Sequence, residues 1–138
     1  MAQSGSPTTT YNVYRVFREQ KKGPDHEAIA LVPAQNERQT AGRFYHVTGS
    51  VGMGMDYEVK PGYFFGGTRS YKGSTLIFQM PSALLADFER IARARPPPHD
   101  PRALMEAHPD PPVRNCSHWV EEVLSDTRAF LEEKGLNV

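Results

Sequence analysis

Residues 115–135 read NCSHWVEEVLSDTRAFLEEKG, and this stretch carries the clearest helical pattern in the chain. The residues of its apolar face recur at the spacing of an amphipathic helix. They are Trp119, Val120, Val123, Leu124, Thr127, Phe130 and Leu131. Asn115 is a favoured N-cap residue, and Gly135 is a typical stop after a helix. The pattern therefore predicts a helix that begins just after Asn115 and ends near Lys134.

The segments before this helix predict strands first and a second helix later. Runs rich in β-branched and aromatic residues predict strands at 11–17, 28–32, 43–48 and 55–60, the last ended by Pro61. Phe64-Phe65 and Thr75–Met80 flank a glycine-rich turn and predict a hairpin. Ser82 is expected to cap a helix that ends before Pro96-Pro97-Pro98 and has an apolar face of Leu84, Leu85, Phe88, Ile91 and Ala92. Strands followed by helices favour an α+β fold, with an antiparallel sheet packed against helices.

Length, charge and hydropathy limit the classes of protein to which the chain can belong. Its 138 residues suit one domain, which we place at residues 11–138, after a polar tail at residues 1–10 that we expect to be disordered. The 16 Lys and Arg residues balance 16 Asp and Glu residues, so the basic excess of a nucleic-acid-binding protein is missing. No apolar run reaches the roughly 20 residues of a membrane span. A single cysteine excludes an internal disulfide and favours a cytoplasmic location.

Cys116 has the strongest chemical signal in the sequence. As the first residue of the final helix, it lies where unpaired backbone N–H groups and the helix dipole lower the pKa of a thiol. A cysteine nucleophile also needs a base. The candidates are His26, which precedes one predicted strand, and His46, which lies within the next. His118 points about 200° around the helix from Cys116, so we expect it to have a packing or surface role.

Three other interpretations are open on the residues alone. Cys116 can be a small buried hydrophobic residue without any chemistry. Cys116, His26 and His46 can together bind zinc, although their spacing matches no usual zinc motif. The proline-rich segment Pro96–Pro112 can be the binding site of a small interaction module.

The segment Asn115-Cys116-Ser117-His118-Trp119-Val120 resembles the Asn-Cys-Glu-His-Phe-Val signature of lecithin:retinol acyltransferase-like enzymes, with Ser117 in place of the acidic residue. Those enzymes are a circularly permuted branch of the NlpC-type, papain-like cysteine superfamily, in which the histidines precede the cysteine. Residues 25–33 and 44–50 are similar to the two histidine strands of that branch. The second stretch also resembles small fungal proteins of the superfamily, which end in an Asn-Cys-x-x-Trp helix.

This resemblance implies a permuted papain-like domain that transfers or hydrolyses an acyl group through a thioester. Cys116 is then the nucleophile, His26 the base, and His46 the group that orients His26, with backbone N–H groups at the helix start as the oxyanion site. The expected substrate is a small molecule or peptide with an acyl group, and no cofactor, metal ion or nucleic acid is implied. Candidates for an apolar acyl pocket, or else for the core, are Met53, Met55, Tyr63, Phe64 and Phe65. The alternative is a small-molecule-binding protein or cyclase on the same scaffold, in which Cys116 is not catalytic.

Side-chain alternation along the strand after His26 gives one geometric expectation. One face carries His26, Ala28 and Ala30, and the other carries Ile29 and Leu31. We expect the helix end with Cys116 to approach the face with the small residues. Its sulfur should then lie within about 4 Å of the His26 ring, with His46 at the other nitrogen of that ring.

Overall fold

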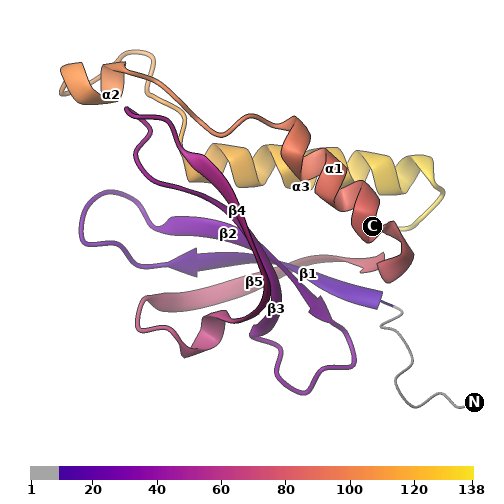
Figure 1. Cartoon of the computed structure of the whole chain (residues 1–138). Coiled ribbons are helices and arrows are strands. Elements are labelled where there is room, and N and C mark those ends of the chain that lie inside the picture. The colour runs from indigo at the N-terminus through magenta and orange to yellow at the C-terminus, as the bar shows by residue number, and fades with distance from the viewer. Residues whose placement is uncertain (1–9) are drawn as a thin grey trace, which may run out of the picture.

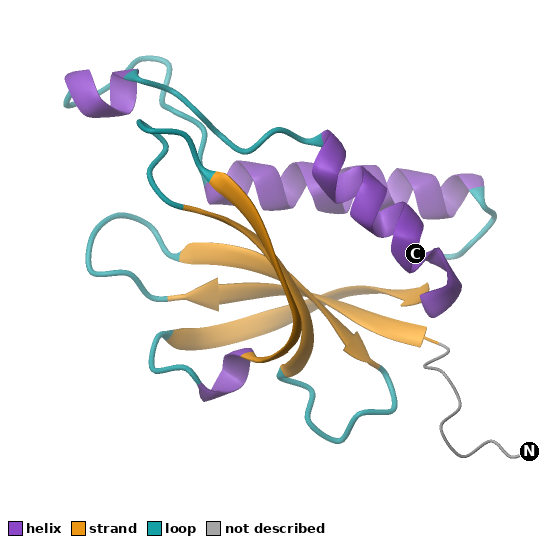
Figure 2. Cartoon of the chain, viewed as in Figure 1, coloured by secondary structure: helices purple, strands orange, loops and turns teal. Residues whose placement is uncertain are grey.

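A computed structural model describes residues 10–138 as an antiparallel sheet with two helices over one of its faces (Figures 1 and 2). The strands are β1 (Thr10–Arg18), β2 (His26–Pro33), β3 (Ala41–Thr48), β4 (Asp56–Phe64) and β5 (Tyr71–Pro81). The helices are α1 (Leu85–Ala94), α2 (Arg102–Met105) and α3 (Cys116–Glu133), with 3₁₀ turns at Phe65–Gly67 and Ser82–Leu84. The expected α+β fold is confirmed. The tail expected at residues 1–10 lies outside the described residues, except for Thr10, which begins β1.

The strands are ordered β4-β3-β2-β1-β5, and every neighbouring pair is antiparallel. The hairpin expected between Phe64-Phe65 and Thr75–Met80 was wrong, because β4 and β5 occupy opposite edges of the sheet. Phe65 gives the physical reason. Its side chain is fully buried, with ring contacts to Phe44 and Tyr71, so the chain after β4 is drawn across the face of the sheet to the far edge.

Pro61 does not end a strand as expected. β4 continues through it to Phe64, with an irregular register opposite Gly42 and Phe44. Proline cannot donate to a strand ladder and is tolerated on an edge strand, where one side of the backbone needs no partner. β4 is such an edge strand, because in the described sheet it pairs with β3 on one side and with no strand on the other.

Apolar clusters cover both faces of the sheet. On the face under α1 and α3, Ile29 and Leu31 pack with Trp119 and Cys116. On the other face, the smaller cluster consists of Val16, Ala28, Ala30, Val32, Phe44 and Phe65. The expectation that α3 approaches the alanine face was therefore wrong. The bulky side chains of β2 meet the bulky helix residues, while the alanines leave room for the rings of Phe44 and Phe65.

The start of α3 follows the expected capping chemistry. Asn115 is the N-cap residue, and its Oδ1 accepts a hydrogen bond from the Ser117 N–H at 3.0 Å. The Asn115 N–H donates in turn to His118 Nδ1 at 3.0 Å, which completes a capping box and gives His118 its role. Gly135, with φ +79°, follows the helix in the left-handed conformation that glycine favours.

The start of α1 differs from its expectation. Ser82 was predicted as the N-cap residue, but it opens a 3₁₀ turn, and the N-cap of α1 is Leu84. The expected core face is present, with Phe88, Ile91 and Ala92 buried. None of the helices within residues 10–138 is long and apolar enough to cross a membrane.

Candidate active site

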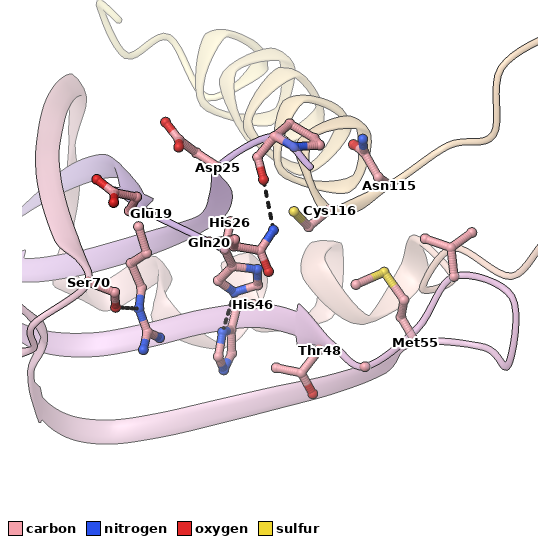
Figure 3. A pocket seen from close by; sticks show the side chains of 14 residues that line it. Glu19, Gln20, Asp25, His26, His46, Thr48, Met55, Ser70, Asn115 and Cys116 are labelled. Carbon is pink, nitrogen blue, oxygen red and sulfur yellow. Dashed lines mark hydrogen bonds between the residues drawn. The ribbon is translucent and has the colours of Figure 1, made fainter. Parts of the chain in front are cut away.

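A cavity of about 410 Å³ opens where the start of α3 meets the ends of β1, β2 and β3. His26, His46, Asn115 and Cys116 all contribute to its wall. Figure 3 shows the Cys116 sulfur projecting from the helix start into this cavity, on the side where the His26 ring lies. The structure thus brings together the three residues that the sequence analysis singled out, although they are far apart along the chain.

The two histidines form one hydrogen-bonded chain that continues to a carboxylate. His26 Nε2 lies 2.9 Å from His46 Nδ1, so the expected contact between the two rings is present (Figure 3). His46 Nε2 lies 2.6 Å from Glu58 Oε1. His46 and Glu58 are direct cross-strand partners in the β3–β4 register, which places both side chains on the same face.

The carboxylate determines which ring nitrogens carry protons. An ionised carboxylate can only accept hydrogen bonds, so His46 Nε2 must carry the proton of that bond. His46 Nδ1 of the neutral ring is then an acceptor, and His26 Nε2 donates to it. The remaining nitrogen of a neutral His26 ring, Nδ1, therefore keeps a free lone pair. A base in the tautomer needed to accept a proton thus lies in the wall of the cavity beside Cys116.

Both imidazoles are held neutral at pH 7. Burial, followed by the nearby His46 ring and the Arg18 guanidinium, lowers the pKa of His26 to about 4. Burial also lowers the pKa of His46, against the opposing effect of Glu58. The bond from His46 in turn lowers the pKa of the Glu58 carboxyl, which keeps it ionised.

Burial raises the pKa of the Cys116 thiol, and the residue is only 6 % exposed. Backbone N–H groups of Glu27, Ser117 and Cys116 favour the thiolate, but their effect is smaller than that of burial. The expectation of a lowered thiol pKa was therefore wrong. The resting state is a neutral thiol in the same cavity as a neutral imidazole, and the approach of the sulfur to about 4 Å from the His26 ring stays a prediction.

Most of the residues that line the cavity have polar side chains, and most of the candidates for an apolar acyl pocket lie elsewhere. Of the five candidates for that pocket, only Met55 reaches this cavity. Phe65 is buried in the second cluster, Met53 is 73 % exposed, and Tyr63 and Phe64 line a different depression near Arg43. The polar wall residues include Arg18, Glu19, Gln20, Asp25, Thr48 and Ser70.

Two residues of the site were missed by the sequence analysis. Glu58 could be found only through the β3–β4 register, because nothing in the local sequence marks it. Arg18 is likewise the cross-strand partner of His26 in the β1–β2 pair. Within residues 10–138, no three His, Cys, Asp or Glu side chains converge in a way that could hold a metal ion.

Comparison with known families identifies the family of this chain but no activity. One family model matches residues 13–130, which include both histidines, Glu58 and Cys116. The chain belongs to DUF6540, a family of unknown function. No curated protein and no solved structure matches this DUF6540 chain. Its chemistry must therefore be argued from the geometry of the site.

Proposed function

We propose that the chain is a cysteine-dependent acyl-transfer enzyme, a hydrolase or an acyltransferase, that works through a thioester on Cys116. One observation carries the proposal. The only cysteine of the chain opens onto the same cavity as His26, whose Nδ1 is left as a free base by the chain of bonds through His46 to Glu58. A nucleophile, a base and groups that orient the base are the parts that thioester chemistry requires.

In the first step, His26 Nδ1 accepts the thiol proton while the Cys116 sulfur bonds to the carbonyl carbon of the substrate. The negative charge that develops on the carbonyl oxygen needs a donor. The Ser117 N–H is engaged by the Asn115 side chain, so we assign this role to the N–H of Cys116, which has no acceptor within the helix at that position. When the carbon–oxygen or carbon–nitrogen bond breaks, His26 returns its proton to the leaving group.

In the second step, water or another acceptor attacks the thioester. His26 accepts a proton from this nucleophile, and the Cys116 sulfur leaves and recovers a proton from His26. Because the resting thiol and imidazole are both neutral, proton transfer accompanies attack instead of preceding it. His46 and Glu58 touch no reacting atom in this scheme and act as positioning residues.

We also propose that the domain has a permuted papain-like topology, similar to that of lecithin:retinol acyltransferase-like enzymes. Three features support this: the histidine-bearing β2 and β3 precede the cysteine, the cysteine begins the last helix, and two imidazoles lie in series behind it. Most of the residues that line the cavity are polar, which departs from an enzyme that holds a long apolar acyl chain. Binding or cyclisation of a small molecule without a role for Cys116 is the competing outcome of the test below.

An activated ester and intact-mass measurement test the proposal directly, because the chain has one cysteine. With 4-nitrophenyl acetate, we expect release of nitrophenol and a transient acetyl group on Cys116. The Cys116→Ala variant should keep the fold, with a loss of stability below about 2 kcal/mol, and form no thioester. His26→Ala should acylate far more slowly, whereas His108→Ala, which alters an exposed loop histidine, should match the wild type.

Two outcomes would contradict the proposal. The first is acylation that persists in Cys116→Ala at the wild-type rate. The second is labelling of Cys116 that does not change in His26→Ala. Either result would favour the binding or cyclase alternative, in which the cavity holds a ligand and the thiol is structural.

A further inference from the structure

Arg18 lies at the end of β1, directly across from His26 in the β1–β2 register. Its side chain is half-buried and lines the cavity into which Cys116 projects. Ser70 orients the guanidinium, because Arg18 Nε donates to Ser70 Oγ at 3.1 Å. Ser70 is itself held next to β1 by a hydrogen bond from the Glu19 N–H to its carbonyl at 2.8 Å. One edge of the fork is thus held by the protein, while its terminal nitrogens remain able to meet a ligand.

Arg18 differs from the other half-buried arginines because it has no partner for its charge. Among residues 10–138, no carboxylate lies within ion-pair distance of it. Each of the other half-buried arginines has a partner for its charge. The partner is a carboxylate for Arg15, Arg43, Arg95 and Arg102, and the face of the Phe78 ring for Arg128. Partial burial of a cation without a counter-charge lowers the stability of the fold. Such an arrangement is expected where a ligand supplies the counter-charge.

The two acidic residues in the wall of the cavity, Asp25 and Glu19, do not supply a counter-charge for Arg18. Asp25 is neutralised by Lys72, whose Nζ lies 2.9 Å from its Oδ2. Glu19 is exposed, and in Figure 3 its carboxylate points away from Cys116 and from the two histidines. The cavity therefore presents the positive charge of Arg18 in the same wall as His26 and Cys116.

On the basis of the function proposed above, we propose that Arg18 binds a carboxylate of the acyl substrate, so that the enzyme acts on acyl groups with a negatively charged end. A guanidinium matches a carboxylate in geometry and can bind it with two parallel hydrogen bonds. The cavity of about 410 Å³ is of the size that holds a small polar molecule or the end of a peptide. Binding would also neutralise one of the charges that lower the pKa of His26, so the base becomes stronger when the substrate is in place.

A pair of esters of similar acyl length tests this preference. The anionic probe is the mono-4-nitrophenyl ester of glutarate, and the neutral probe is 4-nitrophenyl butyrate. In each case the thiol proton goes through His26 to the leaving nitrophenolate while the acyl carbon bonds to sulfur. We expect Arg18→Gln to slow acylation of Cys116 by the glutarate ester about tenfold or more, without slowing the butyrate reaction. The matched control is Arg69→Gln, which removes the same charge from an exposed site outside the cavity and should change neither rate.

A competition experiment on the unaltered protein avoids any effect of the substitution on folding. Free glutarate should slow acylation by the butyrate ester in the wild type, and the uncharged diamide of glutarate should not. If both esters acylate Cys116 in a His26-dependent way but glutarate does not compete and Arg18→Gln changes neither rate, the carboxylate proposal is overturned and the thioester proposal stands. If neither ester forms a thioester on the wild type, the proposed function itself fails.

Discussion

His46 donates from Nε2 to Glu58 Oε1 at 2.6 Å, across the β3–β4 pair and at the opposite end of the imidazole from His26. The His46 side chain is 4 % exposed and that of Glu58 is 48 % exposed, so the chain of bonds runs from the solvent edge of the sheet to His26, which lines the same cavity as Cys116. Glu58 thereby selects the tautomer of both rings. This relationship links an exposed glutamate to the reaction that we propose at Cys116, a residue that it does not touch.

Glu58→Ala should therefore slow acylation of Cys116 by about tenfold to hundredfold, because the tautomers of both rings are no longer held. Glu58→Gln should retain most of the rate, since its amide oxygen can accept the same hydrogen bond. Nitrogen-15 chemical shifts of the imidazoles report the tautomers directly and should change in Glu58→Ala but not in Glu58→Gln. Asp56→Ala, an exposed acidic position on the same strand, is the control. Equal rates in all these proteins would remove Glu58 from the mechanism.

The two histidines should differ in their importance. His26→Ala removes the base and should lower the acylation rate about a thousandfold. His46→Asn should cost less, about tenfold to hundredfold, because the base remains and only its orientation suffers. Single-turnover rates with 4-nitrophenyl acetate measure both. An inactive His46 variant beside an active His26 variant would reverse the roles assigned here.

The Cys116 thiol should react slowly with a reagent that needs a preformed thiolate. Because burial raises its pKa, labelling by iodoacetamide at pH 7 should be slower than that of the same cysteine in the urea-unfolded chain. The labelling rate should rise steadily through pH 9. A fast plateau between about pH 5 and 7 that is lost in His26→Ala would instead reveal a thiolate–imidazolium pair.

Acid should weaken the fold through His26. The unfolded chain binds the His26 proton below about pH 6.5, but the folded chain binds it only below about pH 4. The contribution of His26 to the free energy of unfolding is therefore fully present above pH 6.5. It is lost as the pH drops toward 4, and the loss is at most about 3 kcal/mol. Urea denaturation at several pH values measures the change, and His26→Gln should flatten it. The exposed His108→Gln should leave the slope as in the wild type.

Local patterns were sufficient for the elements of the fold. The spacing of Trp119, Val120 and Val123 determines the apolar face of α3, and Asn115 determines where that helix begins, because both depend on residues only a few positions apart. Local patterns also located the strands of the sheet, except that β4 continues through Pro61 to Phe64. This is why the α+β class and the position of Cys116 at a helix start could be predicted from the sequence.

Contacts between distant segments were decided only by the tertiary structure. The edges on which β4 and β5 lie depend on the burial of Phe65 against Phe44, and the face on which α3 packs depends on the volumes of Ile29 and Leu31. The bond from His46 to Glu58 depends on strand register, and the unpaired charge of Arg18 depends on which carboxylates its neighbours have already taken. The thiol pKa shows the difference most plainly. The sequence places Cys116 at a helix N-terminus, which lowers that pKa, but the packing of the whole domain buries the sulfur, and desolvation is the larger effect.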